Sequence, residues 1–324
     1  MEQIIISGSI AYDYLMRFPG RFTDHLIDGQ MHQVSLSFLV EEMTKHWGGV
    51  GANIAFNLAM LGMRPKLFNT VGRDFPDYRQ WLEKAGVDTS TVRQLDEVFT
   101  ASFFCNTDLD NNQIASFYSG AMSRAGDYRL ADVYEGIPDL VLISPSDPGS
   151  MSQLAAECRE RGIRFMYDPS QQVPRLSGED LKRDMQGAYA MVVNGYECEV
   201  IQQKTGQSLE QLRRAIDILV VTHGKDGSTI YANGNIIEVP TFHIDEVKDP
   251  TGGGDSFRAG FIRGIAAGLP LKLAGEMGSL VAAYALEHVG TQNHRFTLPE
   301  FITRFRTQFD DGGQLDALVK SAAV

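Results

Sequence analysis

Short apolar runs alternate along the chain with longer segments of helical periodicity. Strand-length runs lie at residues 4–6, 67–71, 140–143, 165–167, 190–193 and 219–222. Helical patterns lie at residues 52–61, 78–85 and 151–161. This alternation predicts an α/β fold of βαβ units, with a mostly parallel sheet flanked by helices on both faces. Sheets of this kind bind ligands beyond the carboxyl ends of their strands.

Two stretches depart from the alternation and predict a small second sheet. The stretches at about 12–46 and 99–118 contain β-type runs, such as 32–38 and 100–105, and no helical pattern lies within either stretch. The second run is expected to start a hairpin that closes at a polar turn near 108–112. That turn begins D-x-D-x-N, but it has Gln113 where a calcium loop needs glycine and has no glutamate at the twelfth position.

The two stretches divide the predicted fold into a core and an inserted lid. We expect an α/β core that binds nucleotide and substrate at residues 1–11, 48–98 and 119–324. The β-sheet lid is expected at residues 12–47 and 99–118. A sheet inserted twice near the ligand edge of an α/β body is well placed to cover a bound ligand.

The amino-acid composition limits the kinds of partner that the protein is expected to bind. The 324 residues are 43% hydrophobic and 22% charged, which is ordinary for a folded globular protein. The formal net charge of -12 and the scattered basic residues disfavour nucleic-acid binding. Cys105, Cys158 and Cys198 have no metal-ligand spacing, which is typical of buried thiols in a reducing compartment. Without a basic leader or a membrane-length apolar run, the protein is expected in the cytoplasm and away from membranes.

The segment 248–261, KDPTGGGDSFRAGF, carries the strongest chemical signal. Gly252, Gly253 and Gly254 run into Asp255 and then into a helical pattern. Backbone N–H groups that converge at a helix N-terminus favour an anion such as a phosphoryl group, and Asp255 is placed to accept a proton from an attacking hydroxyl. Taken alone, a glycine triplet before an N-cap aspartate is also an ordinary loop. The chain has no GxxxxGK[ST] sequence of a P-loop.

A second glycine segment, HWGGVGANIAFN at 46–57, precedes a helical pattern. Gly48 and Gly49 permit close backbone approach to a substrate, and Asn53 in the first helical turn can bond a hydroxyl. The segment lacks the third glycine of a dinucleotide fingerprint. Asp13 follows the first strand, and its two carboxylate oxygens suit a pair of vicinal hydroxyls.

These motifs resemble those of the ribokinase-like (PfkB) carbohydrate and nucleoside kinases. DPTGGGDSF at 249–257 resembles the family's C-terminal signature, and GGVGAN at 48–53 resembles its N-terminal one. Asn194 and Glu197 match an NxxE motif, which implies a Mg²⁺ site held through water. The signature departs from its common form at Gly253, where a bulkier or alanine-like residue is usual, and at Ser256, where alanine is usual. Glycine at 253 adds flexibility to the loop but keeps its backbone donors, so the departure is expected to affect the rate more than the kind of reaction.

The resemblance narrows to adenosine kinases of the mycobacterial type in segments 8–22, 113–122, 168–172 and 290–292. It implies a homodimer whose lids clasp each other. The implied ribose ligands are Ser9, Asp13, Gly49 and Asn53, and the implied neighbours of the substrate are Gln171, Gln172 and Arg175. Phe117 would stack on adenine and Phe103 would close the pocket from the partner subunit, although both also suit plain sheet packing.

The implied reaction transfers the γ-phosphoryl group of ATP to the 5′-hydroxyl of adenosine, giving AMP and ADP. Asp255 would be the base, and the N–H groups of residues 252–255 would stabilise the transferred group. The implied ATP-binding residues are Asn194, Thr222, Gly224, Gly227, Gly252 and Gly254. Asp249 and Thr251 match a monovalent-cation site, such as one for K⁺. A sugar kinase for ribose or fructose, a broader nucleoside kinase and a non-catalytic ligand sensor on the same fold remain alternatives.

Overall fold

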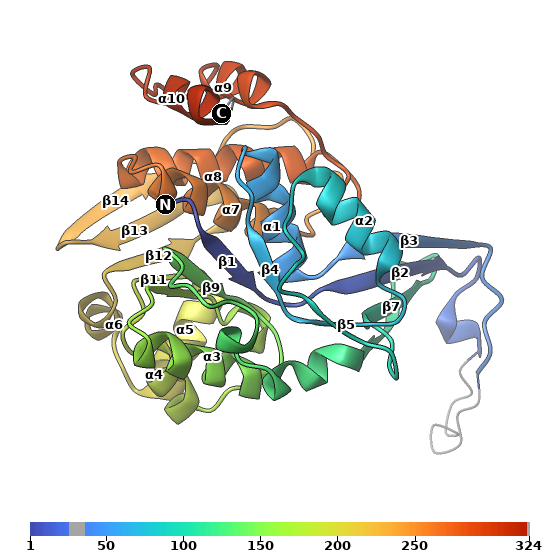
Figure 1. The fold of residues 1–324 in the computed structure, drawn as a ribbon. Coiled ribbons are helices and arrows are strands. Elements are labelled where there is room, and N and C mark those ends of the chain that lie inside the picture. The colour runs from blue at the N-terminus through green and yellow to red at the C-terminus, as the bar shows by residue number, and fades with distance from the viewer. Residues whose placement is uncertain (26–35, 323–324) are drawn as a thin grey trace.

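A largely parallel sheet forms the centre of this computed structural model (Figure 1). Within residues 1–25 and 36–322, the part of the chain that the structure describes, the sheet has eight strands in the order β14-β13-β12-β11-β10-β9-β1-β4. The strands are β1 Ile4–Ser7, β4 Lys66–Phe68, β9 Leu140–Ile143, β10 Phe165–Tyr167, β11 Ala190–Asn194, β12 Ile218–Thr222, β13 Ser228–Ala232 and β14 Asn235–Val239. Pairing is parallel from β4 to β12, and β13 and β14 add antiparallel strands at one edge.

Helices cover both faces of this sheet, as the sequence predicts (Figure 1). One face carries α1 Val50–Met60, α2 Pro76–Ala85, α7 Gly253–Ala266 and α8 Leu271–Leu286. The other carries α3 Pro148–Glu160, α4 Gly178–Met185, α5 Gly195–Thr205 and α6 Leu209–Ala215. Successive residues of a strand point to opposite faces, so Ile4 and Ile6 pack into the first core cluster and Ile5 into the second. Burial on both faces explains why β1 is a continuous apolar run.

A third apolar cluster lies outside the main sheet. Residues of α8 pack there against α9 Leu298–Phe305 and α10 Asp316–Ala322. The remaining elements are the short strands β5 Thr70–Gly72 and β6 Arg93–Leu95 and the 3-10 turns η1 Phe22–His25, η2 Gly120–Asp127, η3 Leu130–Asp132, η4 Ser170–Gln172 and η5 Gly224–Asp226. In the described part of the chain no helix combines the length and the apolar character that a membrane span requires.

A separate four-stranded sheet lies beside the carboxyl ends of the core strands. Its order is β3-β2-β7-β8, from β2 Ala11–Arg17, β3 Glu42–Gly48, β7 Ala101–Thr107 and β8 Gln113–Tyr118. The strand register aligns one residue from each strand in a single row, namely His46, Asp13, Phe103 and Phe117. We call this sheet the small sheet; its role as a lid stays a prediction.

Two sequence predictions need correction. In the run at 32–38, residues 32–35 lie outside the described part and residues 36–38 are not in a strand. The strand that pairs with β2 in the second sheet is β3, at residues 42–48. The single run at 67–71 forms two strands, β4 and β5, separated by Asn69. The hairpin prediction is confirmed by β7 and β8, and the carboxylate of Asp108 accepts backbone N–H groups of Phe22, Asp110 and Asn112 around its turn.

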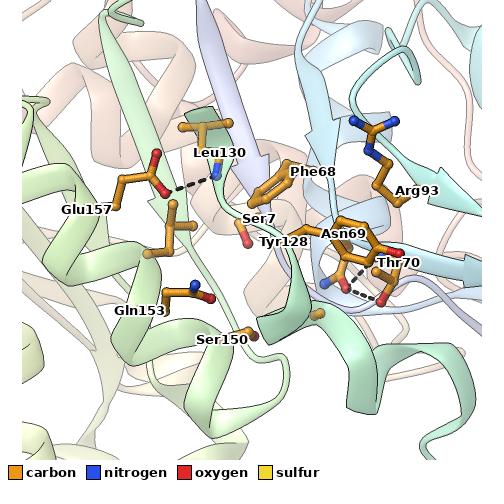
Figure 2. A pocket seen from close by; sticks show the side chains of 12 residues that line it. Ser7, Phe68, Asn69, Thr70, Arg93, Tyr128, Leu130, Ser150, Gln153 and Glu157 are labelled. Atoms are coloured by element: carbon orange, nitrogen blue, oxygen red, sulfur yellow. Dashed lines mark hydrogen bonds between the residues drawn. The ribbon is translucent and has the colours of Figure 1, made fainter. Parts of the chain in front are cut away.

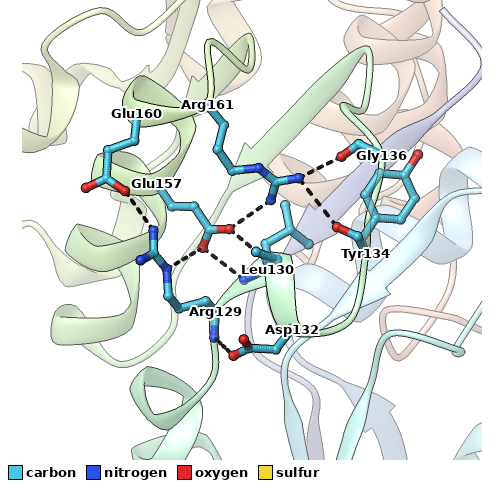
Figure 3. Close-up of polar contacts among 9 residues, drawn as sticks. Arg129, Leu130, Asp132, Tyr134, Gly136, Glu157, Glu160 and Arg161 are labelled. Carbon is cyan, nitrogen blue, oxygen red and sulfur yellow. Dashed lines mark hydrogen bonds and ion pairs between the residues drawn. The ribbon is translucent and has the colours of Figure 1, made fainter.

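A buried carboxylate joins α3 to the segment that follows η2 (Figure 3). Glu157 is 1% exposed, and its oxygens accept the N–H groups of Leu130 and Ala131 at 2.9 and 2.8 Å. Arg161 donates to it at 2.8 Å, and Arg129 lies 3.6 Å away. Because buried carboxylates need such partners, this cluster fixes η3 against helix α3.

Close to that cluster, a small cavity of about 10 Å³ has room for about one water molecule (Figure 2). Its lining includes polar groups of Asn69, Tyr128 and Glu157. A cavity of this size cannot hold a metabolite, so the substrate-sized spaces lie elsewhere.

Candidate active site

Two substrate-sized cavities meet at the glycine turn that begins α7. The first, of about 380 Å³, lies between the small sheet and the core, and Gly252 and Asp255 belong to its lining. The second, of about 540 Å³, has Gly253 and Gly254 in its lining. A single turn therefore separates the two cavities, with Asp255 facing the first one.

The turn itself is shaped by Gly252. This residue is the N-cap of α7 and has a φ of 79°, a left-handed conformation that glycine adopts without strain. A Cβ at this position would also lie 2.8 Å from Cγ2 of Thr291. The first N–H groups of a helix have no partner within the helix, so those of α7 are available to an anion at the junction of the cavities.

Asp255 occupies the first turn of α7, as predicted. Burial raises the pKa of Asp255 to about 6, although the nearby Arg258 cation and a hydrogen bond from Asn53 oppose the increase. The Asn53 Nδ2 to Asp255 Oδ2 distance is 2.8 Å. A carboxylate whose pKa lies near neutrality can accept a proton and still be ionised at pH 7, which suits a general base.

Asp13 approaches the same cavity from β2. Burial, and secondarily the negative charge of Asp249, raises the pKa of Asp13 to about 6. A Cβ at Gly48 would stand 2.3 Å from Oδ2 of Asp13, so glycine is needed there to leave room for the carboxylate. The close approach predicted at Gly48 is thus an approach to Asp13.

The row across the small sheet forms one wall of the first cavity. His46, Asp13, Phe103 and Phe117 all belong to its lining. Phe117 is 51% exposed and Phe103 lies opposite it on the neighbouring strand. The two rings are therefore in the cavity of their own chain, and a contribution of Phe103 across a subunit interface stays a prediction.

The other predicted substrate residues divide into two groups. Ser9, Gly49, Asn53 and Gln171 belong to the described lining. Gly48, Gln172 and Arg175 lie outside it; Gln172 is buried and donates from Nε2 to the carbonyl of Ser146 at 2.9 Å, and Arg175 is exposed. These three residues do not belong to the described lining of the first cavity, and their contact with a substrate stays a prediction.

The second cavity contains the predicted ATP residues Thr222, Gly224 and Gly227. Its apolar wall, which sequence reasoning missed, comes from Phe242, Ile244, Val247, Phe257, Ala282, Ala283 and Leu286. A cavity with an apolar wall that ends at a glycine turn fits a purine base beside the wall and phosphates at the turn. Gly253 also serves packing, since a Cβ there would lie 3.1 Å from Cδ2 of Leu286.

Asn194 and Glu197 form a reciprocal capping box at the start of α5. Asn194 Oδ1 accepts the N–H of Glu197, and Glu197 Oε2 accepts the N–H of Asn194, each at 2.8 Å. The other oxygen of Glu197 accepts a long hydrogen bond from Ser170 Oγ at 3.5 Å, so it keeps acceptor capacity toward a hydrated cation. These residues therefore fit a Mg²⁺ held through water.

The possible monovalent-cation residues line the first cavity. Burial opposes ionisation of Asp249, but the N–H groups of Gly290 and Thr251 hold the pKa of its carboxyl below the ordinary value. Asp249 thus joins the loop before α7 to the loop after α8. Its oxygens are engaged with backbone donors, and cation binding stays a prediction.

Further polar residues surround Asp255 that sequence reasoning gave no role. Arg258, one turn along α7, pairs with Asp168 at 2.7 Å. Thr291 and Gln292 bring two hydrogen bonds to Asn53 from a loop more than 230 residues away in sequence. The sequence signal for Arg258 is its place in the segment 248–261, and that for Asp168, Thr291 and Gln292 is their place in segments 168–172 and 290–292. No local pattern assigns these residues a contact.

The fold is ribokinase-like, with a mostly parallel central sheet, flanking helices and a small additional sheet. The chain belongs to the pfkB family of carbohydrate kinases, whose family model matches residues 9–297.

Several nucleoside kinases are similar over nearly the whole chain. One from Methanothermobacter thermautotrophicus is 31% identical over 312 residues, covering 95% of this chain and 97% of that protein. The structure of Burkholderia thailandensis nucleoside kinase in complex with inosine is 34% identical with a TM-score of 0.83, covering 95% and 98% of the two chains. That of Methanocaldococcus jannaschii nucleoside kinase is 27% identical with a TM-score of 0.84, covering 95% and 99%.

Proposed function

We propose that this protein is an ATP-dependent nucleoside kinase that phosphorylates the 5′-hydroxyl of adenosine. The observation that carries the proposal is the glycine turn, which separates a cavity containing Asp13, Asp255 and two aromatic rings from a second cavity of nucleotide size. Similarity to nucleoside kinases over 95% of the chain supports the nucleoside class. A broader nucleoside kinase is the second candidate, because one similar structure holds inosine.

In the proposed complex, Asp13 accepts hydrogen bonds from the ribose hydroxyls, and Phe117 stacks on the base. This arrangement directs the 5′-hydroxyl toward Asp255 and the glycine turn. A carboxylate can take two hydroxyl hydrogens at once, and an aromatic ring can stack on any base. Shape and charge of the first cavity thus suit a ribose with an attached base better than a free sugar.

The proposed phosphoryl transfer follows from the positions of these groups. Asp255 accepts the proton of the 5′-hydroxyl, whose oxygen attacks the γ-phosphorus of ATP in line; the bond to the bridging oxygen breaks and ADP leaves. N–H groups of residues 252–255 stabilise the negative charge on the transferred group. Bound Mg²⁺ supplies charge neutralisation on the phosphates, and Asn194 and Glu197 would hold it through water.

We also propose a homodimer in which the small sheets of two subunits pack together. Strand β8 is exposed along its whole length, and Ile114, Phe117 and Tyr118 on it are 48%, 51% and 44% exposed. An exposed strand with several apolar side chains favours a partner surface. Light scattering across a range of protein concentrations tests this assembly.

A substrate panel tests the function. With MgATP, adenosine, inosine, cytidine and ribose are compared by ADP release, and the product of adenosine is identified by mass as AMP. The proposal expects kcat/KM to be highest for adenosine; equal values for inosine would favour the broader nucleoside kinase, and a preference for ribose would overturn both. Asp255→Asn is expected to lower kcat by about 10²–10⁴-fold while nucleoside binding, measured by calorimetry, persists.

A further inference from the structure

A chain of hydrogen bonds runs from α2 to the carboxylate of Asp255. Trp81 Nε1 donates to Gln292 Oε1 at 3.0 Å, and Gln292 Nε2 donates to Asn53 Oδ1 at 3.0 Å. Asn53 Nδ2 then donates to Asp255 Oδ2 at 2.8 Å. Asn53 and Gln292 are 4% and 1% exposed, so water does not compete with these bonds.

The direction of this chain is fixed at its start. An indole nitrogen can only donate, so the amide of Gln292 must turn its oxygen to Trp81 and its nitrogen to Asn53. The same Nε2 reaches the hydroxyl oxygen of Tyr78 at 2.6 Å, and that hydroxyl donates to the carbonyl of Gly48 at 2.8 Å. Both neighbours of Gln292 therefore select the same amide orientation.

The orientation of Asn53 follows from that of Gln292. Its Oδ1 also lies 2.8 Å from Thr291 Oγ1, but that hydroxyl has a single proton and also lies 3.0 Å from the carbonyl oxygen of Trp47. The Gln292 amide is therefore the donor that fixes the oxygen side of Asn53. A flipped amide would set its NH₂ group against that of Gln292 and its oxygen against the Asp255 carboxylate, two repulsive contacts in a buried site. Only one N–H of Asn53 is then left for a substrate hydroxyl.

We propose that Trp81, Gln292 and Asn53 are positioning residues that present a fixed N–H donor to Oδ2 of Asp255, so that the substrate proton is accepted on Oδ1. The inference rests on the proposed function of Asp255 as base. It gives Asn53 a task beyond the predicted contact with ribose, and it gives a task to Trp81, which lies outside the described linings of both cavities.

Other charges act on Asp255 and must stay constant in a test. Arg258 on α7 favours its ionised form, whereas Asp168 after β10 and Asp13 on β2 oppose it. His46 of β3 and Asp249 of the loop before α7 line the same cavity. The positioning chain consists of neutral groups, so variants within it leave all five of these ionisable side chains in place.

Gln292→Met tests the central bond, because methionine has a similar length and no strong donor. Loss of the donor to Asn53 allows its amide to turn when Asp255 is protonated and to accept a hydrogen bond from that carboxyl group, which stabilises the protonated form. The acid limb of the kcat/KM profile, where activity falls toward low pH, should therefore move to higher pH by roughly half a unit to one unit. Trp81→Phe is expected to move this acid limb in the same direction by a smaller amount. KM for ATP should change less than about twofold in both, since neither side chain lines the second cavity.

Trp47→Phe is the matched control. Trp47 stacks on Tyr78 at 4.7 Å and lies 6.1 Å from Trp81, but its indole N–H is outside the chain of bonds. The Trp47→Phe variant removes a similar ring area, and the acid limb of its kcat/KM profile should stay at the wild-type pH. Thermal unfolding of all three variants separates this outcome from a general loss of packing.

A direct measurement keeps the test independent of the nucleoside assay. Carboxyl ¹³C NMR of the ligand-free protein, with the Asp255 signal assigned by its loss in Asp255→Asn, should show a higher Asp255 pKa in Gln292→Met and Trp81→Phe. An unchanged Asp255 titration in both folded variants would overturn the positioning chain. Failure of the wild type to phosphorylate any nucleoside, with the titration shifted as expected, would overturn the proposed function and leave the positioning chain standing.

Discussion

Nη2 of Arg258 lies 2.7 Å from Oδ1 of Asp168, and both side chains are almost fully buried beneath the glycine turn. Ser144 Oγ donates to the second oxygen of Asp168 at 2.8 Å. Nη1 of Arg258 would be 2.9 Å from a Cβ at Gly254, so the guanidinium lies directly against the turn. The charge pair is therefore part of the support of α7 at the point where the cavities meet.

Removing one partner of this pair should be costly. Arg258→Met is expected to lower the free energy of unfolding by about 3–5 kcal/mol, because Asp168 is left as an uncompensated buried charge. Urea denaturation measures the change. Arg258→Met combined with Asp168→Asn should lose less than Arg258→Met alone, and Arg21→Ala in the exposed Arg21–Asp110 pair should cost less than about 1 kcal/mol. A double variant as unstable as the sum of the single ones would contradict this account.

The two raised carboxyl pKa values predict the pH profile. Asp13 and Asp255 both have pKa values of about 6, and the proposed reaction requires both to be ionised, Asp13 to bind ribose and Asp255 to accept the proton. Activity should therefore fall as the pH drops through about 6, with log kcat/KM approaching a slope of two. Asp13→Asn should reduce this slope to one. A slope of one in the wild type would mean that a single ionisation governs the reaction.

The same two groups affect stability in the opposite direction. Their folded pKa values lie above the ordinary value of 3.8, so the native protein binds protons more tightly than the unfolded chain does. Their contribution to stability is present below pH 4 and is lost as the pH rises to about 6. Asp13→Asn should accordingly flatten the pH dependence of unfolding in this window.

Phe117 should distinguish a nucleoside from a free sugar. Phe117→Ala is expected to weaken adenosine binding by about 1–3 kcal/mol through loss of base stacking, with little effect on any turnover of ribose. Phe104→Ala is the matched control, since Phe104 is on the opposite face of β7 and stacks on Tyr14 at 4.9 Å. Steady-state KM values give the comparison. If Phe117→Ala raised KM equally for adenosine and ribose, Phe117 would contribute to sheet packing and not to base stacking.

Glu157 offers a test of the fold outside the active site. Glu157→Ala leaves the N–H groups of Leu130 and Ala131 without their acceptor, whereas Arg161 keeps the carbonyls of Tyr134 and Gly136. The expected cost in urea denaturation is about 1–3 kcal/mol for each N–H group that stays unpaired. Glu160→Ala is the control on the same helix, because Glu160 is 62% exposed and meets only Arg129. Its loss should cost less than about 1 kcal/mol. Similar costs for the two variants would argue against the buried cluster as the anchor of η3.

The core could be predicted from the sequence because its strands are buried on both faces. Burial makes strands such as β9 and β11 continuous apolar runs, which a single pass along the chain detects. Strand β3 was misplaced for the opposite reason. It lies at an edge of the small sheet, and its residues Glu42 to Lys45 are exposed, so no apolar alternation marks it.

The site shows a similar division. Glycine-rich turns at helix starts are local patterns that the sequence alone reveals. Gly252 and Asp255 line the first cavity and Thr222 lines the second, and their functional roles stay predictions. Contacts such as Asn53 with Gln292 join residues 239 positions apart and depend on how α1 meets the loop after α8. Side-chain pairing across such separations is set by tertiary packing and leaves no periodic trace in the sequence.

The chain has two tryptophans, Trp47 and Trp81, and their rings lie 6.1 Å apart beside Tyr78. The intrinsic tryptophan fluorescence of the protein therefore comes from a single pair of neighbouring rings, close to the first cavity. Trp47 is on a strand of the small sheet and Trp81 on a helix of the core. Any movement between these two bodies changes the spacing of the emitters, so the unlabelled protein carries an optical reporter of how its two sheets stand relative to each other.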